Sequence, residues 1–586
     1  MRSPITLLFV FFVVVVLAAG VSGTCAAEPT SREVMQISSD TRIAVLHGRE
    51  IELEVRADKQ DDYASLARRL TGDETQAEAL EAHNSPARVA PDSWIRVPLA
   101  LLTPEFRSLA LTNLFPRDYQ DGEDWIHLAR SGGLATYDEG LWQVAEWFAG
   151  RGEAFSELMA ANGLASPELR EHQSVRIPAA LVHPAFRARM HSDDGALAFA
   201  SDRDGPFAGY RLQAGEALYS AVVVRFTGRT SAEDVREVTA QLLARSNIRD
   251  PRDIAVGYVV KIPLDLLEPE FLPSGHPRRR EAEAQQAELD RVLAQQPVAG
   301  AGSGLEGLVV ILDPGHGGRD LGTMNHGIWE HDYVYDVACR LKRLLETRTA
   351  ATVVMTLEDK ETGCVPSKRD KLVANHQGTI LTTPAFLAKE EGEAKIGVNL
   401  RWYLANSVYR DVVKRGVSPD RVVFVSLHAD SRHPGLRGVM VYVPGANYRT
   451  KIYGSNASVY RKYRQVQEKP TISFSKKQRV RSLAVSHKLA RAVVESFEQA
   501  GLPVHPYQPV REKVIRGRAK WVPAVLRGNA VPTKVLVEMV NLSNRADAKL
   551  LASAAKRQAL AGALERALFR YYGEPPPAAA TAMAAE

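Results

Sequence analysis

A short phrase occurs three times in the first half of the sequence, and it limits what this half can fold into. In each copy an apolar residue, a basic residue and another apolar residue precede a proline, and a second proline follows six positions later. The copies are Ile95-Arg96-Val97-Pro98, Val175-Arg176-Ile177-Pro178 and Val260-Lys261-Ile262-Pro263, with Phe106, Phe186 and Phe271 two positions after the second prolines. Because internal self-similarity marks repeated structural units, the sequence predicts three related modules.

The middle copy shows the expected order of elements within one module. The stretch from Tyr137 to Phe148 has the pattern of a turn that opens into an amphipathic helix, and a second short helix is expected around residues 156–161. A loop follows Asn162, and the stretch from Ser174 to Ile177 is typical of a strand. Each module is therefore predicted to contain a strand, two helices and a strand, which is a small α+β unit.

The third copy shows what such a module could bind. Its Gly215-Glu216-x-Leu218 start, and the asparagine, apolar and proline finish of the repeats, resemble LysM, a module that recognises glycans containing N-acetylglucosamine. The first copy lacks the glycine turn, and all three copies carry insertions. The resemblance implies binding to glycan strands. The alternative is that the modules are spacers that have kept only the fold, because a repeat establishes architecture and not a ligand.

In the second half, apolar β-branched runs alternate with helical patterns, which predicts an α/β domain whose sheet is flanked by helices. The expected strands are 309–312, 352–357, 422–427, 439–443 and 535–538, and the expected helices are 333–347, 398–414, 482–500 and 547–572.

Polar side chains lie where three of these strands end. His316 lies in Asp-Pro-Gly-His-Gly-Gly after the first strand, His428 lies in Ser-Leu-His-Ala-Asp, and Glu538 closes a third strand. Glu330 begins the helix after the first strand, so it can reach the same edge, where the carboxyl ends of strands form a crevice. Two imidazoles and one carboxylate leave a zinc ion with an open position, as hydrolytic sites require. Glu538 then fits a general base.

Each of these residues also has an ordinary interpretation when taken singly. A lone buried histidine usually fills a core position, and Glu330 could cap its helix. The glycines near His316 could form a phosphate-binding loop, although neither the GxGxxG spacing nor a Gly-Lys-Ser/Thr sequence is present. We expect His326, His331 and His433 to lie behind the ligands or on the surface, and we give His505 no role.

Taken together and in order, the motifs around His316, Glu330, His428 and Glu538 resemble the zinc-dependent N-acetylmuramoyl-L-alanine amidases, over about residues 308–572. The resemblance implies that His316, Glu330 and His428 bind Zn²⁺ and that Glu538 is catalytic. It also implies cleavage of the amide between N-acetylmuramic acid and L-alanine of the peptidoglycan stem peptide, in wall remodelling or daughter-cell separation. One departure is Met539-Val540-Asn541-Leu542, which replaces the Thr-Gly-Phe-hydrophobic sequence common in the family.

Two other interpretations of function stay open from the sequence. One is a wall-binding protein whose amidase domain is structural or regulates a partner, although the four required residue types are all present. The other is a zinc hydrolase that acts on free peptides, as a carboxypeptidase does. Only the family resemblance disfavours the second.

Two stretches, 361–397 and 445–480, look like insertions near the active edge, where long loops are typically lids or docking surfaces. Some amidases of this family block their zinc site with an inserted segment until a partner removes it, so an activator protein is a candidate partner. The second stretch is strongly basic. It could contact anionic wall polymers or lipid headgroups, or it could be an ordinary solvated face.

The N-terminus predicts export, because Arg2 precedes an apolar stretch from Ile5 to Ala19 that ends in small residues. The protein is then expected in the periplasm or cell envelope, and at a membrane only if the signal stays uncleaved or Cys25 is lipidated. The remaining Cys339 and Cys364 either bridge or both stay unpaired. A net charge of +5 over 586 residues does not call for nucleic acid, and we expect none as a partner.

These patterns divide the chain into seven expected parts. They are a signal peptide at 1–27, a degenerate LysM-like module at 42–110, two further LysM-like modules at 133–190 and 207–273, a linker at 274–304, the zinc amidase domain at 305–573, and a disordered tail at 574–586.

Overall fold

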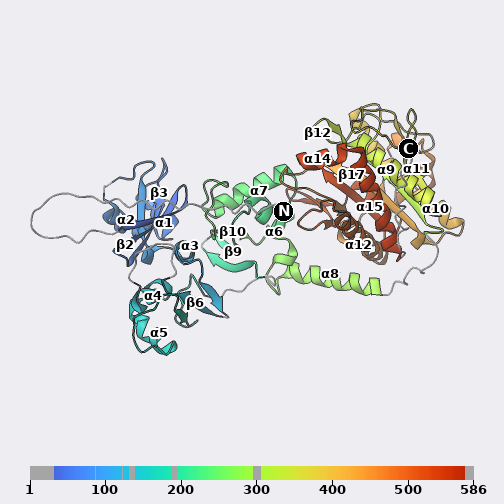
Figure 1. Cartoon of the computed structure of the whole chain (residues 1–586). Helices are drawn as coiled ribbons and strands as arrows, with labels where there is room; N and C mark the ends of the chain where they lie inside the picture. Colours follow the sequence, from blue (N-terminus) through green and yellow to red (C-terminus); the bar gives the residue numbers. More distant parts are fainter. Residues whose placement is uncertain are drawn as a thin grey trace, which may run out of the picture. The chain divides into compact units, whose positions relative to one another are not determined.

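The computed structural model describes residues 32–573, apart from residues 86–87, 122, 131–138, 188–194, 203, 295–304 and 456. The expected signal peptide, Cys25, the end of the expected linker and the tail at 574–586 lie outside the described residues. The chain forms two compact units that divide after Ala188 (Figure 1). None of the helices in the described part is both long and apolar enough to cross a membrane.

The first unit contains two small antiparallel sheets, each with a helix pair before its last strand. In the first sheet β1 (Arg32–Ser38), β2 (Thr41–Leu46), β3 (Glu50–Arg56) and β4 (Trp94–Pro98) lie in that order, with α1 (Tyr63–Leu70) and α2 (Ala77–Asn84) between β3 and β4. Helix α3 (Pro104–Leu114) follows. In the second sheet β5 (Tyr119–Asp121), β6 (Asp124–Leu128) and β7 (Ser174–Ile177) enclose α4 (Leu141–Phe148) and α5 (Phe155–Ala161).

The third repeat has the same order of elements and lies in the second unit. Its sheet consists of β8 (Leu197–Asp202), β9 (Gly205–Arg211) and β10 (Val259–Pro263), and its helical part comprises the turn Leu218–Val224, α6 (Arg225–Thr227) and α7 (Ala232–Arg245). The expected order of strand, two helices and strand is present in all three repeats. In each repeat a further strand precedes this order and pairs with its first strand as a hairpin, and in the first repeat β1 adds one more strand. The sequence pattern did not indicate these strands.

One hydrogen bond explains the spacing of the two prolines in every repeat. The residue before the second proline donates its backbone N–H to the end of the first helix, at Leu70, Phe148 or Phe226. The donors are Thr103, His183 and Glu268, at 2.9, 2.7 and 2.8 Å. The repeated phrase therefore ties the last strand back to the helix pair, and the recurrence of this bond confirms that the three copies share one architecture.

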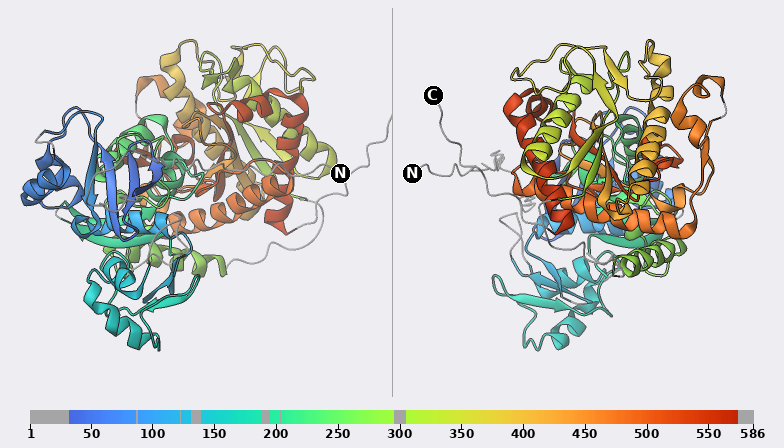
Figure 2. Two further views of the ribbon diagram at one scale, coloured as in Figure 1. Left: turned by 60° about the vertical axis from the view of Figure 1, so that its left-hand side comes forward. Right: turned by 90° about the vertical axis from the view of Figure 1, so that its right-hand side faces the viewer.

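The second unit is built on a six-stranded mixed sheet (Figure 2). Its order is β14 (Thr352–Met355), β11 (Val309–Pro314), β17 (Val422–Asp430), β24 (Thr533–Asn541), β18 (Met440–Tyr442) and β21 (Val510–Arg511). The first four strands are parallel, and β18 runs antiparallel to β24.

Helices cover both faces of this sheet. Val310 and Leu312 of β11 pack in a core shared with α9 (Glu330–Arg348), α12 (Lys476–Gln499) and α15 (Ala554–Tyr572). Val309 and Ile311 point the other way and pack with α10 (Ala394–Lys414) and α13 (Ala524–Arg527). Burial on both faces explains why these strands are continuous apolar runs. The predicted α/β domain with a sheet flanked by helices is confirmed.

The single long helix expected at 547–572 is wrong, because the chain breaks at Ser553 into α14 (Arg545–Ala552) and α15. The buried side chain of Arg557 takes up the carbonyls of Leu551 and Ala552, which would otherwise lack partners at the end of α14. Its Nε also lies 2.6 Å from the Asp336 carboxylate. Arg557 has five N–H donors, and it finds acceptors for them at the place where the helix is interrupted. Helical periodicity in the sequence does not indicate this interruption.

In the stretch expected to be a linker, residues 277–294 form an 18-residue helix, α8 (Pro277–Ala294). This helix packs against α12, and its Leu289 belongs to the core of the amidase sheet.

The two insertions are folded parts of the second unit. In residues 361–397, Cys364 forms a disulfide with Cys339 of α9, and β16 (Gly378–Ile380) pairs with β15 (Leu357–Asp359), which lies just before the insertion. In residues 445–480, Arg449 is buried and donates to the backbone carbonyls of Arg527 and Asn529 at 3.0 and 2.8 Å. Part of the basic run is therefore structural.

The third repeat is joined to the amidase sheet by polar and apolar contacts. Leu436, from the loop after β17, lies in the core of the repeat. Asp234 accepts the backbone N–H of Gly517 at 2.6 Å, and Arg511 donates to the carbonyl of Gly228 at 2.7 Å. This repeat is thus part of the unit that carries the sheet.

Candidate active site

His316 lies in the turn after β11, where the backbone must bend sharply. Its φ is 65°, and the following Gly317 and Gly318 also have positive φ. The ring is held through Nδ1, which lies 2.9 Å from Asp320 Oδ1, so Nε2 faces the interior of the site. A metal-binding histidine is typically oriented by such a carboxylate on its second nitrogen.

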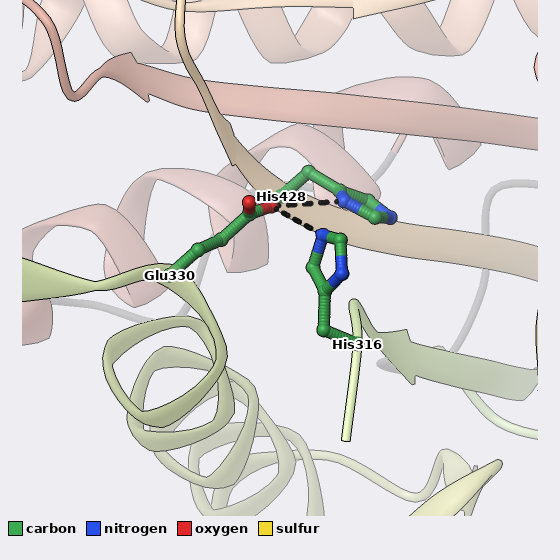
Figure 3. Close-up of side chains that lie close together, drawn as sticks. All are labelled: His316, Glu330 and His428. Carbon is green, nitrogen blue, oxygen red and sulfur yellow. Dashed lines mark hydrogen bonds and ion pairs between the residues drawn. The ribbon is translucent and has the colours of Figure 1, made fainter. Parts of the chain in front are cut away.

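Glu330 is the first residue of α9 and is buried. Its Oε1 lies 3.1 Å from His316 Nε2 and 3.0 Å from His428 Nδ1, so one carboxylate oxygen meets both imidazoles (Figure 3). The backbone N–H of Thr323 donates to Oε2 at 2.9 Å. Burial by itself raises the pKa of Glu330, but the two histidines outweigh it and hold this pKa well below its usual value. The carboxylate is therefore charged.

His428 and Glu538 come from neighbouring parallel strands and are partners in register, so their side chains lie on the same face of the sheet. Oε2 of Glu538 is buried and has no hydrogen-bond partner in the described part of the chain. Burial raises the pKa of Glu538 well above its usual value, and the nearby carboxylates of Asp430 and Glu330 raise it further. A carboxyl whose buried oxygen has no partner, placed beside two imidazoles, is the arrangement expected of a proton acceptor.

Two glycines let the backbone close tightly on these side chains. A Cβ at Gly322, whose φ is +70°, would lie 2.6 Å from Glu330 Oε2 and from His316 Cδ2. A Cβ at Gly315 would lie 2.5 Å from the His428 ring. The glycine-rich sequence therefore serves the packing around the three side chains.

Asp313, at the end of β11, holds the neighbouring elements of the site together, and the sequence motifs gave it no role. Its two carboxylate oxygens accept from Arg401 of α10 and from Ser426 of β17, each at 2.7 Å, and Thr356 also donates to it. Arg401 further donates to the Pro314 carbonyl, which fixes the turn that carries His316. The signal that could have revealed Arg401 is a cation within the apolar run Leu400–Ala405.

Asn541 explains the unusual Met539–Leu542 sequence after Glu538. Its Oδ1 accepts the backbone N–H groups of Arg432 and Ser543, and its Nδ2 donates to the carbonyls of His433 and Leu436. One amide side chain therefore holds the loop after β17 against the end of β24. This contact links both strand ends of the site to the loop that reaches the third repeat.

The spare histidines lie outside the group formed by His316, Glu330 and His428. His326 is exposed, and the His433 ring stacks on Tyr219 of the third repeat with centroids 5.1 Å apart. His331 is buried with Nδ1 3.2 Å from the Gly315 carbonyl, and burial lowers its pKa to about 4. His505 is buried between strands, and desolvation lowers its pKa to about 3.

The three expected ligands fit a metal ion. Their ligand atoms all lie within 4.8 Å of one another, and no second such group of three occurs among the residues that the structure describes. Two imidazoles and a carboxylate are a donor set that zinc favours, and this set leaves a coordination position free. The expected base Glu538 lies beside the same group.

The family model for N-acetylmuramoyl-L-alanine amidase matches residues 310–384 and 386–570, which include all four residues of the site. The C-terminal domain belongs to this family. The protein is therefore an enzyme, an N-acetylmuramoyl-L-alanine amidase, and its substrate class is peptidoglycan.

Solved structures similar to the chain are also amidases by name. The N-acetylmuramyl-L-alanine amidase Ami1 from Mycobacterium smegmatis is 20% identical with a TM-score of 0.29, over 46% of this chain and 99% of that one. The CwlD amidase from Clostridioides difficile, in complex with the GerS lipoprotein, is 18% identical with a TM-score of 0.28, over 45% and 98%. The amidase AmiC2 of Nostoc punctiforme is 19% identical with a TM-score of 0.26, over 47% and 100%. No curated protein matches the chain.

Proposed function

We propose that the protein is an exported, zinc-dependent hydrolase that cuts the amide between N-acetylmuramic acid and L-alanine of the peptidoglycan stem peptide. The observation that carries this proposal is the meeting of His316, Glu330 and His428 within 4.8 Å. We infer which bond is cut from the name of the matched family.

His316 Nε2, His428 Nδ1 and the Glu330 carboxylate would hold the ion, since these atoms already converge. When bound there, zinc supplies Lewis acidity that activates water and polarises the carbonyl of the scissile amide. The protein provides the orientation of the ligands. Asp320 fixes the His316 ring, and the Asp313–Arg401 pair fixes the turn that carries it.

Glu538 would act as general base and then as general acid. Its free Oε2 can accept the proton of the attacking water and deliver it to the departing nitrogen of L-alanine. Burial raises the pKa of this carboxyl, so the proton that it accepts from water is held firmly enough to be passed on to the departing nitrogen. Arg432, which pairs with Asp430 and donates to the Tyr442 hydroxyl at 2.8 Å, places a balancing positive charge near this carboxyl.

The three repeats are proposed to bind glycan strands and so hold the enzyme on its polymeric substrate. Their resemblance to LysM and the shared hydrogen bond that closes each repeat support this role. The apolar segment before residue 27 supports export to the periplasm or cell envelope. The Cys339–Cys364 disulfide fits an oxidising compartment.

An activator protein is also a candidate partner, although this structure leaves the metal ligands reachable. The His316 and His428 side chains are 23% and 18% exposed. Neither insertion adds a fourth ligating side chain to the group within the described residues. We therefore propose that the protein has activity without removal of an inserted segment, in wall remodelling or daughter-cell separation.

The test is to incubate the purified mature protein with peptidoglycan and to identify the soluble products by mass spectrometry. The proposal predicts stem peptides with a free L-alanine amino terminus, and loss of this release with a zinc chelator. Release of reducing sugar ends, or cleavage within the stem peptide alone, would overturn it. Digestion of intact wall and of free stem peptide in parallel separates an amidase from a peptidase.

A further inference from the structure

A basic cavity of about 510 Å³ lies between the C-terminal half of α9, the start of α15 and residues 366–368 of the first insertion. Arg340, Arg343, Arg348 and Lys368 line it together with Ser367 and Gln558. No acidic side chain is among the described residues that line the cavity. Four cations around one cavity require an explanation, because like charges held together are destabilising unless an anion is near.

The insertion forms one wall of the cavity and is fixed there at several points. The disulfide joins Cys364 to Cys339 on α9. Cys364 lies three residues before Ser367, which lines the cavity. The backbone N–H of Ser367 donates to Asp336 at 2.6 Å, and Arg340 donates to the Ser367 carbonyl. Asp370 accepts the backbone N–H of Ala554 at 2.7 Å. The cavity is thus built by fixed elements and not by a free loop.

The carboxylates near the cavity balance only part of this charge. Asp336 pairs with Arg340 at 2.7 Å, but it also pairs with the buried Arg557 at 2.6 Å, so one anion serves two guanidinium groups. Glu565 lies 3.2 Å from Arg348. Arg343 and Lys368 are exposed, and neither side chain has a hydrogen-bond or ion-pair partner in the described part of the chain. The amino end of the 19-residue α15 adds partial positive charge.

We propose that this cavity binds a phosphate group. Planar guanidinium groups match the oxygens of a carboxylate or a phosphate in pairs, but a phosphate carries more negative charge, which several cations can share, so the four cations favour phosphate. The group could belong to a soluble phosphate or to the headgroup of an anionic phospholipid, and both offer the same chemistry. Nothing in the amidase reaction uses such a group, so the site has a role separate from catalysis.

The cavity is separate from the metal group. Arg340 lies ten residues after Glu330 on one continuous helix, which places the two about 15 Å apart along the axis. Loss of the cavity's charge should therefore leave zinc binding and turnover unchanged. A result against phosphate binding would therefore leave the proposed amidase function standing. A result against the amidase function would likewise leave phosphate binding standing.

The experiment is calorimetric titration of the mature full-length protein with pyrophosphate at constant ionic strength. Arg343 and Lys368 can be changed safely because both are exposed and unpaired, so the variant is Arg343→Gln with Lys368→Gln. The matched control is Lys414→Gln with Arg415→Gln, which removes two exposed charges at the end of α10. We expect saturable binding by the wild type and the control, and binding at least tenfold weaker in the cavity variant. Equal binding by the cavity variant and the control would overturn the proposal.

A second arm identifies the source of the phosphate. The same three proteins are sedimented with vesicles of phosphatidylglycerol and phosphatidylcholine, and with vesicles of phosphatidylcholine alone. Sedimentation with the anionic vesicles that is lost in the cavity variant supports a lipid headgroup, and pyrophosphate binding without sedimentation supports a soluble phosphate. Absence of both kinds of binding in the wild type would overturn the proposal. Arg343→Lys with Lys368→Arg should retain binding, since it keeps both charges.

Discussion

At the scale of single residues, the site depends on glycine as much as on its polar side chains. We predict that Gly322→Ala weakens zinc binding at least tenfold, because its Cβ would lie 2.6 Å from both Glu330 and His316. The matched control is Gly327→Ala, whose φ of +75° imposes similar backbone strain but whose Cβ meets nothing within 4 Å. Competition with a chromophoric chelator measures the affinity. Equal affinity in the two variants would show that side-chain contact at Gly322 is unimportant.

His127 makes a second prediction at this scale, in the first unit. Its Nδ1 lies 2.6 Å from Asp118 and its Nε2 2.7 Å from Glu139, so both nitrogens must carry protons. Burial lowers the pKa of His127, but the two carboxylates outweigh it and raise the pKa to about 9. Because this pKa is raised on folding, the contribution to stability is complete below about pH 6.5 and is lost as the pH rises through 9.

The size of that contribution is about 3 kcal/mol in unfolding free energy at pH 6. We therefore expect His127→Gln to lower the calorimetric transition of the first unit at pH 6 and to have a smaller effect at pH 10. His172→Gln, an exposed histidine in the same repeat, should change neither. An effect of His127→Gln that is equal at both values of pH would contradict the charged form.

At the scale of elements, the disulfide fixes the first insertion to α9. The bond closes a loop with a sequence separation of 25 residues, and chain entropy then predicts about 3 kcal/mol of stabilisation. We expect Cys339→Ser with Cys364→Ser to lower the unfolding free energy by that amount and to speed hydrogen exchange in residues 361–376. Reduction of the wild type should reproduce both changes. Unchanged exchange would mean that hydrogen bonds such as those of Ser367 with Asp336 and Arg340 hold the insertion without the disulfide.

The sequence predicted those elements whose cause is local. Strand β11 and helix α9 follow from apolar runs and from periodicity, and the order of the motifs predicted which strand ends would carry His316, His428 and Glu538. The structure brings the three expected ligands together as the motifs required.

Elements with a distant cause could not be predicted in this way. The break at Ser553 depends on Arg557 reaching Asp336, which is 221 residues away in the sequence. The role of Arg401 depends on Asp313, 88 residues away. In the second repeat the hairpin strand β5 has only three residues, all exposed, so its pattern is weak. Long-range pairing of charged groups leaves no periodic signal.

At the scale of the whole molecule, the third repeat differs from the other two because it shares its core with the amidase domain. We predict that a chain beginning at residue 195 keeps the thermal stability of the second unit. A chain beginning at residue 275 should be much less stable, because it exposes Leu436 and leaves the buried Arg511 without its partner at Gly228. Calorimetry of both chains checks this. Equal transition temperatures would show that the repeat is an independent attachment.

A molecule of this kind would combine anchoring with catalysis in one chain. Asn541 and the loop 431–436 join the strand ends of the site to the third repeat, so a glycan bound by this repeat would lie on a unit that also carries the metal group. The basic cavity would add a contact to a phosphate-bearing surface. These roles rest on different residues, and each can therefore be removed without the others.

The central claim is that His316, Glu330 and His428 hold zinc while Glu538 moves the proton. The most direct test is the turnover of Glu538→Gln, measured as stem-peptide release on a sample whose zinc content is determined at the same time. The account predicts one zinc ion per chain, as in the wild type, with turnover lower by a factor of about 10²–10⁴, whereas His316→Ala should lose both. Full turnover in zinc-loaded Glu538→Gln, or loss of zinc from it, would contradict the account.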